Sequence, residues 1–231
     1  MRENKTLFIT ATDTGVGKTM VSGLLLGFLR DKGIDAGYQK WASTGARENC
    51  PDLTTCLKIS GLKPEPGLLD RQAPYRFAFP ASPHLAAELE KRKIEPARII
   101  AAYREMTKRH EVLVVEGVGG LLVPLNRDLL LVDLVARLRL PVIVVARSGL
   151  GAINHTLLTI EALKAREIGI AGAIFTDSAD EDEVIVRDNM RFIAETGGIE
   201  VLGRLPYCPE KKELIREFVP IGEKIGGILF P

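Results

Sequence analysis

The segment Thr12-Asp-Thr-Gly-Val-Gly-Lys-Thr19 decides the fold of this 231-residue chain. It follows a short apolar run, Leu7–Thr10, and opens an amphipathic stretch, Lys18–Lys32, so we predict that it joins a buried strand to a helix. In that setting the backbone N–H groups of the loop form a pocket for phosphate oxygens. Lys18 would reach the outer phosphates, and the Thr19 hydroxyl would ligate Mg²⁺. The strict motif begins with Gly where this chain has Thr, and a glycine-rich turn without function is the alternative interpretation.

The rest of the chain alternates short β-rich runs with longer helical patterns, which indicates a parallel sheet with helices on both faces. Several runs are apolar throughout, as is typical of strands buried on both faces. We therefore predict an α/β fold of the P-loop NTPase type, with a mostly parallel central sheet, as one domain over residues 1–231. A proline-rich stretch, residues 63–83, should be extended or turn and lie as an insertion over one sheet edge. The predicted strands are Leu7–Thr10, Ala36–Trp41, Val112–Glu116, Val142–Ala146, Ala171–Phe175 and Val201–Leu205, and the predicted helices are Lys18–Lys32, Pro96–Arg109, Leu131–Leu138, Gly151–Glu167 and Glu183–Thr196.

Composition excludes several classes of protein. Hydrophobic residues at 46% and charged residues at 26% are typical of globular proteins rather than disordered or fibrous ones. A formal net charge of +1 gives no electrostatic reason to expect a nucleic-acid or membrane partner. No apolar run is long enough for a signal peptide or a membrane-spanning helix. Three cysteines without a CxxC pair fit a reducing compartment, so we expect a cytoplasmic protein.

A second candidate for ligand binding is the run Val112–Glu116, which breaks into Gly117-Val-Gly-Gly120. An acidic residue at the carboxyl end of a buried strand lies where open α/β sheets bind ligands. Glu116 could hold Mg²⁺ directly or through water. The glycines would let the backbone approach a substrate or a phosphate closely. An ordinary transition from strand to turn is the alternative.

Five segments together resemble the motifs of the dethiobiotin synthetase family. They occur in the family's order across residues 7–207, and the combination is far more specific than a phosphate loop alone. The members of that family also lack the strict first Gly of the loop. The segments are Thr12–Thr19, Gly37-Tyr-Gln-Lys40 followed by Ser43-Thr-Gly45, Phe79-Pro-Ala-Ser-Pro-His84, Val115-Glu-Gly-Val-Gly-Gly120 and Leu150-Gly-Ala-Ile-Asn-His155.

The resemblance implies a reaction of 7,8-diaminopelargonate with CO₂ (or bicarbonate as its source) and ATP, with Mg²⁺ as the cofactor. One amine would capture CO₂ as a carbamate, which ATP would phosphorylate. The second amine would attack the resulting carbamic-phosphoric anhydride, closing the ring of dethiobiotin and releasing ADP and phosphate. Such chemistry leaves little covalent work for the protein, so catalysis should depend on positioning and charge stabilisation.

The resemblance also implies roles for individual residues. Lys18 and Lys40 would be catalytic, and Lys40 would stabilise the carbamate and the phosphoryl group during transfer. Asn154 would bind the substrate carboxylate across the interface of a homodimer. Thr19, Asp52 and Glu116 would share Mg²⁺. The implied nucleotide contacts are Gly15, Val16, Gly17, Lys18, Thr19, Met20, Asp52, Glu116, Gly117, Val118, Gly119, Thr176, Asp177, Pro206, Tyr207 and Cys208, and the implied substrate contacts are Thr14, Thr44, Gly120, Gly151 and Asn154.

Simpler explanations exist for some of these residues. Lys40 could be a solvated lysine at a strand end, Asp52 could cap the following helix, and Asn154 could be a first-turn residue without a ligand. Two positions depart from the family. Trp41 stands where the family usually has Pro, which would reshape the packing behind Lys40. Thr176 stands where the family has an Asn that reads adenine, and one hydroxyl cannot span the same donor and acceptor pair.

Two other classes of protein share parts of this pattern. Partitioning or cell-division ATPases have the same architecture, but their loop contains a second Lys where this chain has Asp13. Many of them end in a basic amphipathic helix, whereas the glycine-rich segment Ile221–Phe230 is predicted not to form a stable helix. An amide synthase of the cobyrinate type would need a glutaminase domain with a nucleophilic Cys, for which 231 residues leave no room.

Overall fold

A parallel sheet forms the centre of the protein in a computed structural model that describes residues 5–178 and 181–231. Its strand order is β10-β9-β8-β1-β5-β2, so the first strand lies inside the sheet and is paired on both sides. The six predicted strands are confirmed with ends displaced by at most two residues. The strands are β1 (Lys5–Ala11), β2 (Ala36–Lys40), β5 (Val112–Glu116), β8 (Val142–Arg147), β9 (Ile170–Thr176) and β10 (Val201–Leu205).

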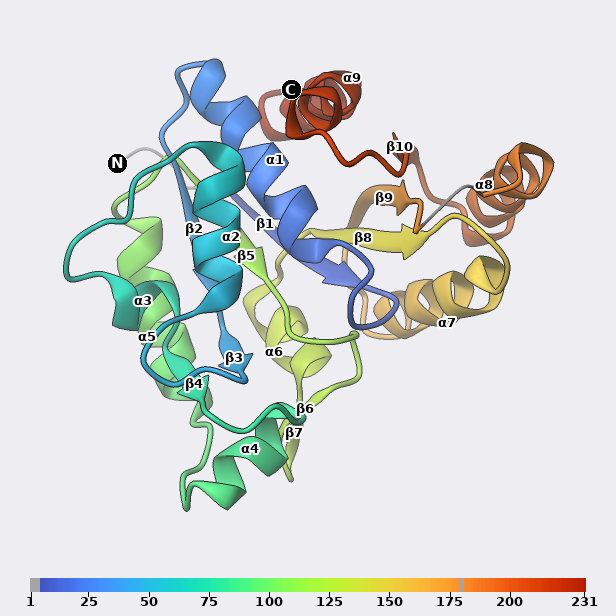
Figure 1. The fold of residues 1–231 in the computed structure, drawn as a ribbon. Helices are drawn as coiled ribbons and strands as arrows, with labels where there is room; N and C mark the ends of the chain where they lie inside the picture. Colours follow the sequence, from blue (N-terminus) through green and yellow to red (C-terminus); the bar gives the residue numbers. More distant parts are fainter. Residues whose placement is uncertain (1–4, 179–180) are drawn as a thin grey trace.

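Alternation of side chains along the strands divides the core into two layers. In β1, Leu7 and Ile9 pack on one face of the sheet, and Phe8 packs on the other. The five predicted helices are confirmed, and Figure 1 shows α9 beside α1 and α7 beside α8. The first face is covered by α1 (Lys18–Asp31), α2 (Pro51–Ser60) and α9 (Lys211–Leu229), and the second by α5 (Pro96–Thr107), α6 (Leu131–Leu138), α7 (Ala152–Lys164) and α8 (Glu183–Gly197). Within the described residues no helix is both long enough and apolar enough to cross a bilayer.

The proline-rich insertion lies beside the edge strand β2. Gln39 of β2 donates a hydrogen bond from Nε2 to the Arg71 carbonyl oxygen at 2.8 Å. The insertion is more regular than predicted, because it contains a short helix and a strand that pairs with β3 in parallel. The remaining elements are β3 (Ala42–Thr44), α3 (Leu69–Gln72), β4 (Tyr75–Phe77), α4 (Pro83–Leu89), β6 (Pro124–Asn126) and β7 (Leu129–Leu130).

The prediction that Ile221–Phe230 is too rich in glycine for a helix is wrong, because α9 continues to Leu229. Each glycine disfavours a helix by roughly 1 kcal/mol in isolation, but tertiary packing overrides this preference. A Cβ atom on Gly222 would lie 2.6 Å from the ring of Phe28 in α1, so the missing side chain lets the two helices approach closely. The buried face of α9 consists of Phe218, Ile221, Gly222, Ile225 and Leu229.

Two glycines of α9 provide a matched test of this packing. We expect Gly222→Ala to lower the free energy of unfolding by about 1–3 kcal/mol, because the new methyl group would overlap Phe28. Gly227→Ala is the control, since no atom lies within 4 Å of its Cβ position. That control should raise stability by about 0.5–1 kcal/mol through helix propensity. Urea denaturation measures both, and equal stabilisation by the two changes would show that close packing does not require Gly222.

Candidate active site

The phosphate loop connects the interior strand β1 to α1. Gly15 and Gly17 have φ angles of +72° and +111°, in the left-handed region that glycine adopts readily. Gly17 is the N-cap of α1, so Lys18 and Thr19 occupy the first turn of the helix. Lys18 Nζ donates a hydrogen bond to the carbonyl oxygen of Asp13 at 3.1 Å. This is the predicted arrangement of loop and helix N-terminus for phosphate binding.

Strand register brings the next two predicted residues to the same end of the sheet. Glu116 at the end of β5 pairs with Lys40 at the end of β2 and, on its other side, with Ile9 of β1. Asp52 approaches from the first turn of α2. The carboxyl ends of three strands and the start of one helix therefore meet beside the phosphate loop.

Four of the predicted residues form a charged cluster. Lys40 Nζ lies 2.7 Å from Glu116 Oε1 and 3.0 Å from Asp52 Oδ2, and it also donates to the Gly117 carbonyl oxygen at 2.6 Å. The hydroxyl oxygen of Thr19 lies 2.9 Å from Glu116 Oε1 and 3.4 Å from Asp52 Oδ1. The side chain of Lys40 is only 4% exposed, so Lys40 is not a solvated lysine at the sheet edge. Asp52 lies inside the helix rather than at its N-cap position, which is Cys50.

The two lysines have opposite pKa shifts. Burial lowers the pKa of Lys40, but the charges of Glu116 and Asp52 outweigh this effect, so its pKa is raised and it remains charged. The pKa of Lys18 is lowered to about 8, mainly by burial and to a smaller extent by repulsion from the charge of Lys40. An anion bound beside Lys18 would favour its charged form. Lys18 and the neighbouring charged cluster are therefore suited to binding a polyphosphate.

Tyr38 is a residue of this cluster that sequence reasoning missed. Its hydroxyl group donates a hydrogen bond to Glu116 Oε2 at 2.8 Å, while Lys40 and Thr19 contact the other carboxylate oxygen. Burial and the charge of Glu116 raise the pKa of Tyr38, so the hydroxyl keeps its proton. Tyr38 precedes Lys40 by two positions in β2, and the period of a strand places both side chains on one face. The two-residue spacing from Lys40 is therefore the feature of the sequence from which Tyr38 could have been identified.

The donor atoms beside the loop fit a hard cation. The Thr19 hydroxyl lies within hydrogen-bonding distance of the carboxylates of both Asp52 and Glu116. Oxygen donors of this kind, few in number and next to a phosphate site, are what Mg²⁺ uses in nucleotide enzymes, since it keeps several waters. The residues present therefore fit Mg²⁺.

The glycine-rich loop after β5 lies against the phosphate loop. Gly119 has a φ angle of +60°, and a Cβ atom there would lie 3.6 Å from the hydroxyl oxygen of Thr14. The corresponding position on Gly120 is 3.5 Å from the carbonyl oxygen of Thr12. A cleft of about 340 Å³ separates this loop from α7, and its lining includes Asp13, Gly120, Leu122, His155 and Leu158.

The start of α7 lies beside this cleft. Gly151 is the N-cap of α7 with a φ angle of +84°, and Asn154 is exposed in the first turn. In the described part of the chain no hydrogen bond joins Asn154 to the cluster around Lys40.

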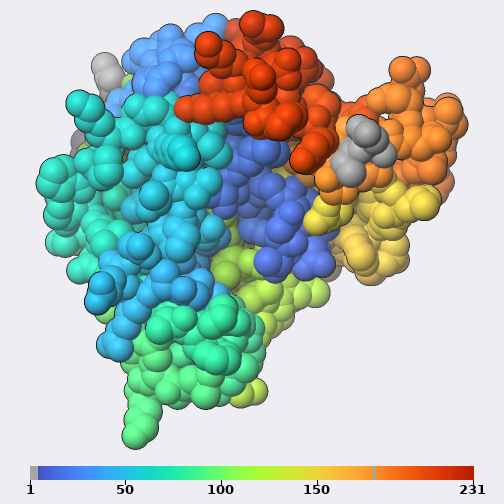
Figure 2. Space-filling model, in the orientation of Figure 1, coloured from blue at the N-terminus to red at the C-terminus, as the bar shows by residue number. Residues whose placement is uncertain are grey.

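Two leucines on this side of the molecule are unusually exposed, Leu150 at 85% and Leu158 at 55%. Figure 2 shows the dark-blue residues of the β1 and α1 region reaching the surface between the cyan residues of the α2 region and the yellow residues of α7.

The nucleotide contacts predicted at the carboxyl ends of β9 and β10 have different surroundings. The Thr176 hydroxyl donates to the carbonyl oxygen of Val16 in the phosphate loop at 2.6 Å. The carboxylate of Asp177 accepts from Arg204 Nη2 at 2.7 Å and from the Ser148 hydroxyl at 2.5 Å. Sequence reasoning did not identify Arg204 or Ser148. Pro206, Tyr207 and Cys208 follow β10, and Tyr207 is largely exposed.

The remaining predicted positions are placed by packing. Trp41 is fully buried with its ring centroid 5.0 Å from that of Phe8, and its Nε1 donates to Gln39 Oε1 at 3.1 Å. This agrees with a packing role behind Lys40. Thr44 ends β3, and Met20 lies in the first turn of α1, next to Gly17.

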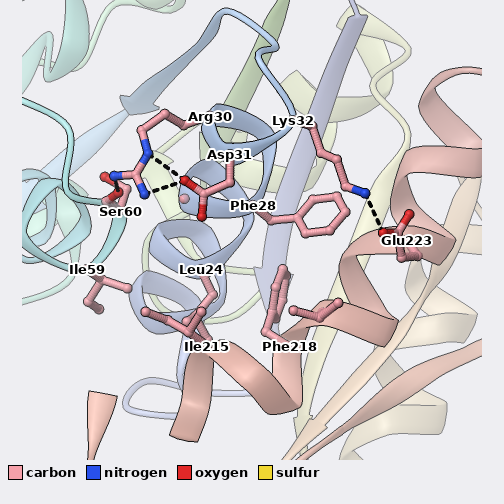
Figure 3. A pocket seen from close by; sticks show the side chains of 12 residues that line it. Leu24, Phe28, Arg30, Asp31, Lys32, Ile59, Ser60, Ile215, Phe218 and Glu223 are labelled. Atoms are coloured by element: carbon pink, nitrogen blue, oxygen red, sulfur yellow. Dashed lines mark hydrogen bonds and ion pairs between the residues drawn. The ribbon is translucent and has the colours of Figure 1, made fainter. Parts of the chain in front are cut away.

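A second cavity, of about 260 Å³, lies between α1 and α9 near the end of α1 that is remote from the phosphate loop. Figure 3 shows Phe28 and Phe218 among the side chains that line it. Its charged side chains are paired with each other, for example Lys32 with Glu223 at 2.6 Å. No group of the proposed reaction lies there.

Comparison with known proteins gives a consistent result. A family model described as an AAA domain matches residues 5–213. The ATP-dependent dethiobiotin synthetase of Anaeromyxobacter dehalogenans is 43% identical over 221 residues, which cover 96% of this chain and 97% of the relative. The chain belongs to the dethiobiotin synthetase family. Another member, the ATP-dependent dethiobiotin synthetase of Nitrobacter hamburgensis, is 41% identical over 224 residues, which cover 96% of this chain and 96% of the relative.

Solved structures explain why a cell-division ATPase was a plausible alternative. The MinD ATPase of Pyrococcus furiosus superposes with a TM-score of 0.63 over 98% of this chain and 100% of its own, at 14% identity. Such low identity shows a shared P-loop fold and no more. The dethiobiotin synthetase family is therefore established by sequence, and its architecture is common to these ATPases.

Two tyrosines allow a matched test of the support given to Glu116. Tyr38→Phe should lower the free energy of unfolding by about 1.5–3 kcal/mol, because a buried carboxylate oxygen loses its donor. Tyr103→Phe should cost only about 0.5–1.5 kcal/mol, since Tyr103 shares a neutral hydrogen bond of 3.0 Å with Thr6. Chemical denaturation of both variants gives the comparison. A loss from Tyr38→Phe no larger than that from Tyr103→Phe would contradict the importance of this contact.

Proposed function

We propose that this protein uses ATP to convert 7,8-diaminopelargonate and CO₂ into dethiobiotin, with ADP and phosphate as the other products. The observation that most supports this is the cluster of Lys40, Thr19, Asp52 and Glu116 beside the phosphate loop, in a chain of the dethiobiotin synthetase family. A family relationship alone would leave open whether the site is intact. The contacts of these four residues support an intact one.

The proposed reaction has three steps. An amine nitrogen of the substrate attacks CO₂ and loses a proton, giving a carbamate. A carbamate oxygen then attacks the γ-phosphorus of ATP, and ADP leaves. Finally the second amine attacks the carbonyl carbon of the mixed anhydride, the bond to the phosphate oxygen breaks, and the five-membered ring closes with loss of a proton.

The second step brings two anions together, and the lysines reduce their repulsion. Lys18 and the N–H groups of the loop would hold the outer phosphates. Lys40 keeps its charge in a buried position, where an electrostatic interaction is stronger than in water. It lies at the end of β2 between the carboxylates and the glycine-rich loop, so it could face both the carbamate and the γ-phosphate.

Thr19, Asp52 and Glu116 would hold Mg²⁺ together with the phosphates of the nucleotide. When bound, the ion would neutralise phosphate charge and orient the γ-phosphate. Tyr38 would keep the Glu116 carboxylate in a fixed orientation. The free state of Cys50, Cys56 and Cys208 is consistent with a cytoplasmic location.

The cleft beside α7 suits the diamine substrate. Leu121, Leu122, Val123 and Leu158 give part of its lining an apolar character that matches an aliphatic chain. Gly120 lines this cleft, and Thr14 of the phosphate loop lies close to the neighbouring Gly119. The free N–H groups at the start of α7 would favour a substrate carboxylate, and in the homodimer proposed below they would belong to the site of the other subunit.

We propose that the active form is a homodimer. Leu122, Leu150 and Leu158 are exposed near the cleft, and burial of such a patch favours association. Asn154 is exposed on α7, the helix that also contains Leu158. In the described residues it forms no hydrogen bond to the Lys40 cluster of its own subunit. Each site would therefore receive Asn154 of the partner subunit.

The decisive assay is release of phosphate from ATP with diaminopelargonate and bicarbonate, against mixtures that lack each component. Lys40→Ala should reduce turnover by about 10²–10³-fold, because one strong electrostatic stabiliser is lost. Lys32→Ala is the matched control, since Lys32 forms an exposed ion pair with Glu223 away from the site. Turnover of Lys40→Ala within about threefold of the parent would contradict the role. Phosphate release that does not need the diamine would contradict the function.

Complementation tests whether two subunits share a site. Lys40→Ala and Asn154→Ala should each be nearly inactive. If each site combines Lys40 of one subunit with Asn154 of the other, a mixed dimer contains one intact site. Random mixing would make half of the dimers mixed, so co-expression should restore roughly a quarter of the parent activity. Mixtures as inactive as the two variants would show that both residues act within one subunit.

A further inference from the structure

We infer that Thr176 controls the affinity of the site for the phosphates of a nucleotide, because it fixes the orientation of the peptide between Val16 and Gly17 in the phosphate loop. Thr176 does not read the base. The inference rests on the proposed function in one respect, namely that the loop binds a nucleotide.

The contact is short and buried. Thr176 Oγ1 lies 2.6 Å from the Val16 carbonyl oxygen and 3.4 Å from that of Ala146. Thr176 is 4% exposed and Val16 is 3% exposed. A threonine hydroxyl has a single proton to donate. The shorter contact takes it, and that contact joins the end of β9 to the phosphate loop.

The planarity of the peptide bond converts this contact into an orientation of the loop. In a trans peptide the C=O of Val16 and the N–H of Gly17 point in opposite directions. Because the carbonyl points toward Thr176, the Gly17 N–H points away from β9. This amide is at the N-cap of α1, where free N–H groups bind phosphate oxygens.

The loop needs such a restraint because of its glycines. Gly17 has a φ angle of +111° and no side chain to hinder rotation of the adjoining peptide. Rotation of this peptide would turn the Val16 carbonyl oxygen toward the bound anion. The Thr176 methyl group also restricts the loop, since Cγ2 lies 3.3 Å from the Cβ position of Gly17. Both branches of the Thr176 side chain therefore hold the same peptide.

The neighbouring groups argue against a role in reading the base. The donor of Thr176 is engaged with Val16 and its side chain is enclosed. The carboxylate of Asp177 is engaged by Arg204 and Ser148. The effect of Thr176 on a nucleotide should therefore be transmitted through the phosphate loop and be the same for every base.

The test compares two substitutions by calorimetric titration with Mg²⁺ and ATP, CTP or inorganic tripolyphosphate, which has no base. Thr176→Val keeps the shape and removes the hydroxyl, and should weaken binding of all three by the same factor of about 2 to 13. Thr176→Ser keeps the hydroxyl, and should bind each of them more tightly than Thr176→Val. Thr10→Val is the control, because the buried Thr10 hydroxyl makes no hydrogen bond to the described residues. That control should leave all three affinities unchanged.

Weaker binding of ATP or CTP by Thr176→Val with unchanged tripolyphosphate binding would overturn the inference, and so would unchanged binding of all three. If Thr176→Val does not fold, Thr176→Ala replaces it, since Ala and Ser at this position differ only in the hydroxyl. Equal binding by those two variants would also overturn the inference. The titrations contain no diamine, so a failure of ring closure would remove the proposed function and leave this result standing.

Discussion

The buried ion pair between Lys40 and Glu116, at 2.7 Å, is the interaction on which the organisation of the site depends. A charge in a protein interior must be compensated, because its desolvation costs roughly several kcal/mol even after relaxation. One partner is not enough here, and Tyr38, Thr19 and Asp52 supply the remaining contacts. These residues come from two strands and two helices, so the cluster is complete only when those elements have come together.

This cluster is better explained by chemistry than by stability. An apolar group of similar volume often stabilises a protein as well as a buried ion pair does. What the ion pair provides is a charged ammonium group, beside two carboxylates and a phosphate loop, that needs no reorganisation when an anion is bound. The strand register that pairs Lys40 with Glu116 therefore contributes directly to the proposed reaction.

Trp41 and Thr176, which the sequence analysis singled out, lie behind the site. Trp41 fills the core against Phe8 and fixes Gln39, which in turn holds the insertion at the edge of the sheet. Thr176 contacts the back of the phosphate loop. The MinD-like ATPases share the fold at 14% identity or less in the structures compared, so the sheet and loop are a scaffold whose function depends on the residues around them.

Local features of the sequence were sufficient to predict the six strands, the phosphate loop and the position of Glu116, whereas Lys40 was predicted only from the resemblance to the family. Apolar runs, glycine spacing and an acid at a strand end act over a few neighbouring residues, so they can be recognised without the fold. The helix at Ile221–Leu229, the Tyr38–Glu116 contact and the Thr176–Val16 contact were not predictable in this way. The two contacts join residues separated by 78 and 160 positions, and the helix depends on the close fit of Gly222 against Phe28. Only the tertiary structure decides such features, because the partner of a buried polar group depends on strand register and helix packing.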